Sequence, residues 1–392
     1  MNRRAAGCYV HLPFCDRICP YCDFAVVEFA RARVGRYLKA VRAELARSPA
    51  DLALASIYLG GGTPSALSAD DIAGLLHAVF AHFGVEPGSI ECTLEANPSR
   101  NAADLNLYRR AGVNRLSIGV QSFDDGELHR LGRDHSADQA RGYISAARAA
   151  GHRNIGIDLI AGAPGQTAQS FQATLARAIE CAPQHVSVYG LTIEAGTPYA
   201  RWFRRSPEEF PDDDATADLL ELAERELTAA GFARYEISNY AKAGFESEHN
   251  RGYWRQQDCV ALGMSASGYE GGRRFRNARS FEAYCAAIEA GASAQEEEEK
   301  LAFEARLGEA AMLSLRTREG IQDGDFRARF GVDPRLVFAA AIDKCRRAGL
   351  LEEDGQGVRL SARGRLLANT ACSEFLHPSF IPAPAGVGKT TS

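Results

Sequence analysis

The chain has 392 residues, which is long enough for two or three domains. With 46% hydrophobic and 24% charged residues it is globular in composition, which excludes a disordered or fibrous protein. A net charge of -5, from 45 basic and 50 acidic residues, gives no reason to expect a nucleic-acid partner. No apolar run reaches the roughly 18 residues that a membrane helix needs. The basic start M-N-R-R-A-A-G-C lacks the apolar stretch of an export signal, so we expect a cytoplasmic protein that does not span a membrane.

Strand-like and helix-like segments alternate through the first part of the chain. The expected pairs of strand and helix are Cys8–Leu12 with Val34–Arg47, Ser56–Leu59 with Ala69–Phe83, Ser89–Leu94 with Asp104–Ala111, Arg115–Ile118 with Ala137–Ala150, Asn154–Ile160 with Gln166–Cys181, and His185–Leu191 with Asp213–Ala230. Such alternation predicts a parallel sheet covered by helices. Six units fit an open or partial barrel, and periodicity alone leaves a doubly wound sheet as the alternative.

The pattern changes after the sixth helix. Tyr235–Ala241 is expected to form one more strand, whereas Glu246–Asn277 is polar, aromatic and glycine-rich without a clear period. We interpret the acidic run Glu296–Glu299 as the solvated start of a helix that continues through Leu301–Leu315, because carboxylates favour the positive end of the helix dipole. Short helices and a β-hairpin near Leu350–Leu360 then suggest a small helical, winged-helix-like domain.

The chain ends in G-V-G-K-T-T-S, which is similar to the end of a phosphate-binding loop. The full motif requires a glycine where this chain has Ala383, and no strand precedes it. We therefore expect residues 381–392 to be a disordered tail rather than a nucleotide site.

Ten cysteines need an explanation without disulfides, because the cytosol keeps thiols reduced. Seven are scattered and are expected to pack as small buried hydrophobes: Cys8, Cys92, Cys181, Cys259, Cys285, Cys345 and Cys372. The other three form a C-x3-C-x2-C cluster of Cys15, Cys19 and Cys22, directly after the first strand. Zinc would require a fourth ligand, and no second C-x2-C pair is present. A [4Fe-4S] cluster usually has four cysteine ligands, so three would leave one iron open to a small molecule.

Polar groups follow the next strands at the ends where a parallel barrel binds its ligands. Glycines let a backbone approach a ligand closely, a carboxylate can accept from ribose hydroxyls, and an amide and a guanidinium can hold a carboxylate. A carboxylate within an apolar strand needs a partner. The residues concerned are Gly61, Gly62 and Thr63 after the second strand, Glu95 after the third, Gln121 with Arg133 after the fourth, and Asp158 in the fifth.

Several motifs together carry a resemblance that covers nearly the whole chain: Y-V-H-L-P-F-C, C-P-Y-C-D-F, L-G-G-G-T-P-S, L-E-A-N-P, S-I-G-V-Q-S-F, D-L-I-A-G-A-P-G-Q-T, L-T-I-E-A-G-T-P, Y-E-I-S-N-Y-A and H-N-R-G-Y-W. The chain resembles the coproporphyrinogen oxidase-like branch of the radical SAM superfamily, and more narrowly the HemW-type heme chaperones. The resemblance implies an α/β fold, a partial (β/α)6 TIM-like barrel with a C-terminal extension and a small helical domain. The implied domains are a barrel over 1–235, an extension with the H-N-x-x-Y-W motif over 236–295, and a helical domain over 296–380.

The resemblance also implies the cofactors and their ligands. Cys15, Cys19 and Cys22 would ligate the cluster, with S-adenosylmethionine on its open iron. The residues implied to contact the cofactors are Tyr9, Phe24, Gly61, Gly62, Thr63, Glu95, Gln121, Arg133 and Asp158. His249 of the H-N-x-x-Y-W motif is the expected heme ligand, with Cys259 as another candidate.

Two features separate the branches of this family. The oxygen-independent coproporphyrinogen III oxidase has a fourth cysteine at the position of Phe24 and a longer segment before its cluster, whereas only fourteen residues precede Cys15 here. The H-N-x-x-Y-W motif belongs to the chaperone branch. The resemblance thus implies a chaperone that binds heme and transfers it to an acceptor protein, such as a membrane respiratory enzyme. The oxidase, and a radical SAM enzyme with another substrate, stay open as alternatives. One departure is Ser267, where the family has a histidine, which predicts altered heme binding.

Overall fold

The computed structural model describes residues 5–378, and the expected tail over 381–392 lies outside them. The chain divides into two compact units. Among the described residues, the first comprises 5–234, 238–252 and 257–299, and the second comprises 235–237, 253–256 and 300–378. Each unit is described by itself below. Among residues 5–378, no helix is long and apolar enough to cross a bilayer.

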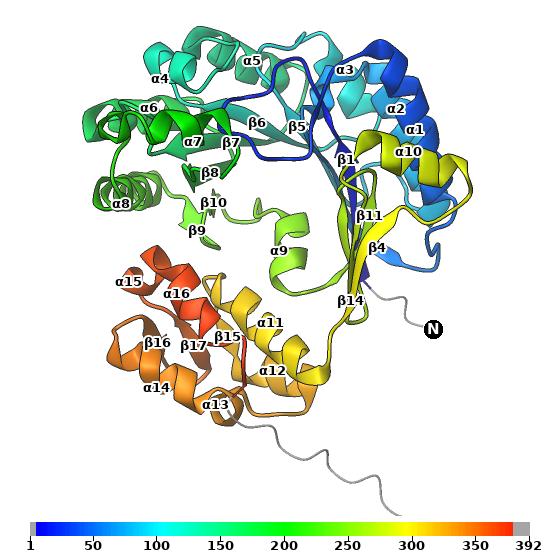
Figure 1. The fold of residues 1–392 in the computed structure, drawn as a ribbon. Helices are drawn as coiled ribbons and strands as arrows, with labels where there is room; N and C mark the ends of the chain where they lie inside the picture. Colours follow the sequence, from blue (N-terminus) through cyan, green and yellow to red (C-terminus); the bar gives the residue numbers. More distant parts are fainter. Residues whose placement is uncertain (1–4, 379–392) are drawn as a thin grey trace, which may run out of the picture. The chain divides into compact units, whose positions relative to one another are not determined.

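A twelve-stranded sheet forms the frame of the first unit (Figure 1). Its centre consists of six parallel strands in chain order: β1 (Ala5–Leu12), β4 (Ala53–Gly61), β5 (Glu91–Ala96), β6 (Arg115–Gln121), β7 (Asn154–Ala161) and β8 (His185–Gly190). The first and last of these strands do not pair with each other, because β11 flanks β1 and β10 flanks β8. The expected partial barrel of six parallel strands is confirmed, and the sheet is open.

Helices follow each of the six strands, as the alternation predicts. They are α1 (Arg31–Leu45), α2 (Ala69–Phe83), α3 (Asp104–Arg110), α4 (Asp125–Arg130), α5 (Ala137–Ala149), α6 (Ala168–Glu180), α7 (Pro198–Phe203) and α8 (Asp213–Ala229). Figure 1 shows the longer ones along the outer side of the curved sheet. Ser68, Ser136 and Thr167 cap the starts of α2, α5 and α6 by accepting a backbone N–H, which explains why these helices begin where they do.

The two faces of the central strands differ in chemistry. Val10, Leu94 and Ile157 are fully buried in the apolar core that joins the sheet to its helices. The alternate positions are polar, because side chains along a strand point to opposite faces. They include Thr93, Arg115 and Asp158, in strands that are otherwise apolar. This inner face of the sheet is therefore built for polar contacts rather than for packing.

The segment without a clear period contains regular structure. It consists of α9 (Glu248–Trp254), β11 (Asp258–Leu262), β12 (Ser267–Glu270) and β13 (Arg273–Asn277), followed by α10 (Phe281–Glu289) and β14 (Gln295–Lys300). β11 continues the sheet in parallel with β1, and β12 and β13 follow antiparallel. The expected strand over Tyr235–Ala241 is only partly present, as β9 (Ala233–Arg234) and β10 (Asn239–Ala241), and β10 is antiparallel to β8.

The interpretation of Glu296–Glu299 as the start of a helix is wrong. These residues lie in β14, the outer strand of the sheet, and the helix begins later, at Phe303. The reason is pairing across the sheet: Glu297 and Glu299 form ion pairs with Arg276 and Arg274 of β13. Such cross-strand charge pairs stabilise a strand, and exposed charges protect a sheet edge from further pairing.

The second unit has the topology of a winged helix. Its elements are α11 (Phe303–Leu315), β15 (Ile321–Gln322), α12 (Asp323–Phe330), α13 (Pro334–Val337), α14 (Ala339–Arg347), β16 (Leu351–Glu353), β17 (Gly357–Leu360), α15 (Ala362–Leu366) and α16 (Ala368–Ser373). The expected hairpin near Leu350–Leu360 is confirmed as β16 and β17, with β15 on the other side of β17. Phe338 and Phe375 are fully buried in a core of its own.

The scattered cysteines pack as expected, since six of the seven are buried and Cys181 is half-buried. None of the ten cysteines forms a disulfide in the described structure.

Candidate cofactor site at the carboxyl ends of the strands

A cavity of about 500 Å³ lies where the parallel strands end. It brings together residues that are far apart in the sequence. The residues named from the sequence that line it are Cys15, Cys19, Cys22, Phe24, Gly61, Gly62, Thr63, Glu95, Gln121, Arg133 and Asp158. Tyr9, His249 and Cys259 do not line it. A volume of this size is typical of a small-molecule site.

The cysteine loop is held at both ends. β2 (Phe14–Cys15) pairs with β3 (Val27–Glu28), so the chain leaves and returns at one place. The Arg100 guanidinium donates to the carbonyls of Ser65 and Ala66, at 3.0 and 2.9 Å, and forms an ion pair with Asp16 in the loop. Cys15 is buried, whereas Cys19 and Cys22 are half-buried.

Glycine at position 62 is required by the packing of this loop. A Cβ there would lie 2.7 Å from the carbonyl carbon and oxygen of Pro13 and 2.9 Å from Cys15 Sγ. The next residue, Thr63, donates its hydroxyl to Cys15 Sγ at 3.5 Å. The end of β4 therefore lies directly against the first cysteine, with no room for a side chain between them.

The thiols are partly or fully buried and lie beside a guanidinium group. Burial raises the pKa of Cys15 to about 11 and also raises the pKa of Cys22, so these two thiols stay protonated at neutral pH and lose their protons on binding a metal. Arg133 Nη1 donates to Cys19 Sγ at 3.4 Å. Arg133 Nε is buried without a hydrogen-bond partner, which leaves a donor for an anionic ligand.

These observations fit a [4Fe-4S] cluster. Within residues 5–378 no three His, Cys, Asp or Glu side chains converge closely enough for a single metal ion. The three thiols instead line one wall of the larger cavity, together with Thr63 and Arg133. The lining contains neither histidine nor a fourth cysteine. A cluster held here would keep one iron for a ligand in the cavity.

Glu95 presents its carboxylate to the cavity from the end of β5. The Tyr58 hydroxyl donates to Oε1 at 2.8 Å, and the backbone N–H of Gly61 donates to Oε2 at 3.1 Å. Burial, helped by the nearby charge of Asp158, raises the pKa of Glu95 to about 7 in spite of these donors.

Asp158 obtains the partners that a buried carboxylate needs. Ser117 of β6 donates to Asp158 Oδ2 at 3.0 Å, and Ser187 of β8 donates to Oδ1 at 2.7 Å. Burial raises the pKa of Asp158, and the charge of the buried Arg115 opposes this rise. The three strands β6, β7 and β8 are thus joined through one side chain on the floor of the cavity.

The backbone of Gln121 takes an unusual conformation. Its φ of 69° lies in the left-handed region, and the pairing of β6 with β7 shifts register between Gly119 and Gln121. A Cβ at Gly119 would lie 2.9 Å from Gln121 Nε2, and Arg133 Nη2 donates to the Gly119 carbonyl at 2.8 Å. Strain of this kind is often stored where a side chain must face a ligand. Gln121 and Arg133 are brought to the same wall, as expected.

Tyr9 does not line the cavity, although it is paired in register with Tyr58 of β4, which does. Its hydroxyl lies 3.0 Å from His11 Nδ1, and its ring neighbours Tyr58 and His249 at centroid distances of 6.1 and 6.4 Å. His11 Nε2 lies 2.8 Å from the carbonyl oxygen of Ala25, which anchors the chain just after the cysteine loop.

His249 is only 3% exposed. Nδ1 lies 2.9 Å from the Ser56 hydroxyl, and the ring stacks on Tyr58 at 5.0 Å. The His249 backbone N–H donates to Glu91 at 3.1 Å. Burial, with a contribution from the charge of Arg115, lowers the pKa of His249 to about 3, so the imidazole is neutral.

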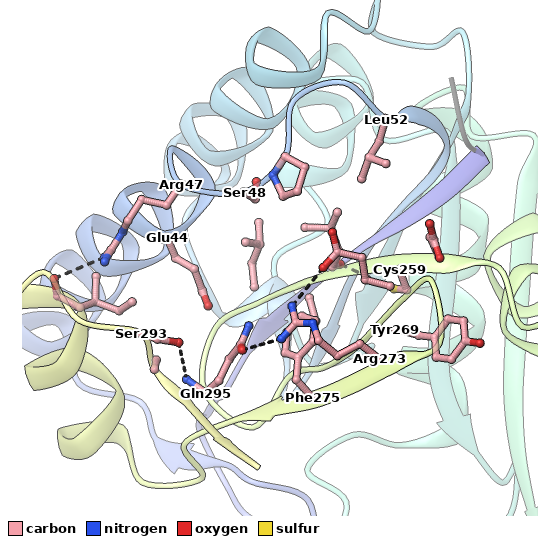
Figure 2. A pocket seen from close by; sticks show the side chains of 18 of the residues that line it. Glu44, Arg47, Ser48, Leu52, Cys259, Tyr269, Arg273, Phe275, Ser293 and Gln295 are labelled. Carbon is pink, nitrogen blue, oxygen red and sulfur yellow. Dashed lines mark hydrogen bonds and ion pairs between the residues drawn. The ribbon is translucent and has the colours of Figure 1, made fainter. Parts of the chain in front are cut away.

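A second cavity of about 480 Å³ lies between the end of α1 and strands β11 to β13 (Figure 2). Cys259 is among its lining residues. Its polar side chains have protein partners: Arg273 bonds Gln295 and Glu270, and Glu44 accepts from Gly263, Asn277 and Tyr284. The hydrogen bonds of Glu44 and Arg273 in this cavity thus connect neighbouring elements of the protein and are already made without a ligand.

Several site residues escaped the sequence analysis. Tyr58, Ser117 and Ser187 act through side chains on the inner face, and Arg100 and His11 anchor the loop. The sequence signal that could have identified the inner-face residues is the occurrence of polar residues at alternate positions in otherwise apolar strands. Their partners depend on strand register, which the sequence does not display.

Comparisons with known proteins agree with this architecture. The profile of the family described as "Radical SAM superfamily" matches residues 9–178, and that described as "HemN C-terminal domain" matches residues 301–367. In structure the chain is similar to the coproporphyrinogen III oxidase HemN from Escherichia coli, with a TM-score of 0.84 and 23% identity over 95% of this chain and 90% of that one. At this identity the likeness shows the fold alone.

Curated relatives named "Heme chaperone HemW" match over most of the chain. The protein from Bacillus subtilis is 32% identical over 94% of this chain and 98% of its own length. That from Mycobacterium tuberculosis H37Rv is 37% identical over 94% of both. That from Escherichia coli K12 is 40% identical over 66% of this chain and 69% of its own length. The chain therefore belongs to the HemW family within the radical SAM superfamily.

Proposed function

We propose that this protein is a heme chaperone, which binds heme and passes it to an acceptor protein. The observation that carries the proposal is the match to relatives of that name over 94% of this chain. A membrane-bound respiratory enzyme is the proposed acceptor, and the cytoplasm is the proposed location.

The residues that line the cavity support the proposal of a [4Fe-4S] cluster with S-adenosylmethionine on its open iron. Cys15, Cys19 and Cys22 would hold the cluster. Once reduced, the cluster would supply an electron to the sulfonium of S-adenosylmethionine. Glu95 and Asp158 would accept from the adenosyl part of the ligand. Gly61, Gly62 and Thr63 would contact its amino group, and Gln121 with Arg133 its carboxylate. Tyr9 and Phe24 complete the proposed contacts; Phe24 lines the cavity, and Tyr9 neighbours the lining residue Tyr58.

His249 is the proposed heme ligand. A neutral imidazole is the form that binds iron, and His249 is neutral at physiological pH because burial lowers its pKa. Since the side chain is only 3% exposed, ligation requires it to leave its position in the barrel. The domain division proposed from the sequence places this residue in the extension over 236–295.

An anaerobic heme titration of the cluster-reconstituted protein, followed by Soret absorbance, tests the proposal. Saturation near one heme per chain is expected, with weaker binding by His249→Ala. The oxidase alternative predicts instead that coproporphyrinogen III and a reductant yield protoporphyrinogen. No saturable heme binding, together with that product, would overturn the chaperone function.

A further inference from the structure

A chain of side-chain contacts joins the cavity to His249. The carboxylate of Glu95 accepts the Tyr58 hydroxyl at 2.8 Å, and the Tyr58 ring stacks on the His249 imidazole at 5.0 Å with an interplanar angle of 28°. Tyr58 therefore contacts both the proposed cofactor ligand and the proposed heme ligand.

The same two strands contribute further contacts to His249, beside its neighbour Tyr9 in β1. Ser56 of β4 lies 2.9 Å from His249 Nδ1. Glu91 of β5 accepts the N–H groups of Glu248 at 3.0 Å and His249 at 3.1 Å. Because β4 and β5 also end at the cavity, the position of His249 depends on the strands that would hold the cofactor.

A ligand on Glu95 would strengthen this chain of contacts. The pKa of Glu95 is raised to about 7, so the carboxyl is partly protonated at neutral pH. Hydroxyl donors from a bound ligand favour the ionised form. An ionised carboxylate is also the stronger acceptor for the Tyr58 hydroxyl. Ligand binding thus holds the Tyr58 ring more firmly against the imidazole.

We propose that occupation of the cavity by a nucleoside ligand whose hydroxyls donate to Glu95 acts through Tyr58 to retain His249 in the barrel, and so opposes heme binding. The inference rests on the proposed function and assigns its regulation. Tyr58 is a positioning residue in this scheme. Because coupling between two binding sites is reciprocal, heme would weaken binding of the nucleoside ligand by the same factor.

The experiment is a heme titration of the reconstituted protein with and without saturating S-adenosylmethionine. Heme affinity is expected to fall at least about fivefold when S-adenosylmethionine is bound, which is the lower end of the range usually found for coupling between two binding sites. Tyr58→Phe keeps the ring and removes the hydroxyl, so the factor should approach one. Tyr143→Phe, another buried tyrosine, on the outer helix α5, should leave the factor unchanged. Antagonism that persists in Tyr58→Phe would indicate direct competition in the cavity and overturn the proposal.

Hydrogen exchange gives a readout that does not need heme. The ligand should slow exchange of the amides of Glu248 and His249 in the unsubstituted protein but not in Tyr58→Phe. A protein that fails to bind heme but shows this protection would refute the proposed function and leave the coupling intact. Unchanged exchange with unchanged heme affinity would refute the coupling alone.

Discussion

Glu95 faces the cavity between two donors, Tyr58 and the backbone of Gly61, and burial, helped by the charge of Asp158, raises its pKa to about 7. The sign of the resulting pH dependence follows directly. Below pH 7 the carboxyl is increasingly protonated and becomes a poorer acceptor, so ligand affinity should fall as the pH is lowered.

The first prediction is that S-adenosylmethionine affinity falls about tenfold from pH 8 to pH 6, measured by equilibrium dialysis with the reconstituted protein. The ionised fraction of a group with a pKa near 7 changes by this order over that interval. In Glu95→Gln the affinity should be lower and the slope lost. An equal slope in this variant would assign the titration to another group.

A second prediction concerns Gly62. Replacement by alanine puts Cβ 2.7 Å from the Pro13 backbone, which has no flexible end that can move aside. Gly62→Ala should therefore retain less than about half of the iron after reconstitution, because the end of β4 must shift away from Cys15.

Gly142→Ala is the matched control, since a Cβ there meets nothing within 4 Å and the residue lies in helix α5. It should keep full iron and sulfide content. Full content in Gly62→Ala as well would show that the loop tolerates the displacement.

At the scale of elements, the cysteine loop is fixed by a contact from outside it. Arg100 binds two carbonyls of the segment after β4 and also the carboxylate of Asp16. A planar guanidinium has several N–H donors in fixed directions and can make these contacts at once, whereas the ammonium group of lysine cannot reproduce that geometry.

The third prediction is that Arg100→Lys shortens the lifetime of the reconstituted cluster in air by a factor of about 10, since losing a group that holds metal ligands in place commonly costs about 10–100-fold in metal affinity. Loss of the cluster absorbance is the measurement. Arg110→Lys, on an exposed position of α3, should leave the lifetime unchanged, and far-ultraviolet circular dichroism should be the same for both variants. Equal lifetimes would remove the proposed tether.

β14 illustrates how an element can depend on its neighbours. Four consecutive glutamates have no strand pattern of their own, and a helix start is a reasonable interpretation of them. The arginines Arg274 and Arg276 of β13 provide the opposite charges, and pairing across the sheet decides the conformation. Secondary structure here is set by a partner some twenty residues away.

At the scale of the whole molecule, the two units have separate cores. The proposed cluster ligands lie in the first unit, and Phe375 is fully buried in the core of the second, with its ring 5.4 Å from that of Phe338. Damage to the second core should therefore change stability without changing the chemistry of the thiols.

The fourth prediction is that Phe375→Ala lowers the free energy of unfolding of the second unit by about 3–5 kcal/mol, the cost of removing a buried aromatic ring. Iron content per folded chain should stay the same. Leu376→Ala, at a position that is 40% exposed, should cost about 0.5 kcal/mol or less. Thermal denaturation followed by circular dichroism would measure both variants, and loss of iron in Phe375→Ala would contradict the separation.

The sequence alone determined the architecture of the sheet and several of the residues that line the cavity. Alternation of strand and helix patterns, cysteine spacing and glycines at strand ends depend on residues that are close in the chain, so they can be recognised without coordinates. The parallel order of six strands then places Cys15, Glu95, Gln121 and Asp158 at one edge, because parallel strands end on the same side.

The tertiary structure decided which side chains meet. Asp158 receives Ser117 and Ser187 because β6 and β8 flank β7 in a particular register, and Tyr58 connects Glu95 to His249 because β4 lies beside β5. The burial of His249 likewise follows from the docking of its segment on the barrel. Register and docking are set by contacts between residues tens to hundreds of positions apart, and a single sequence does not record such pairings.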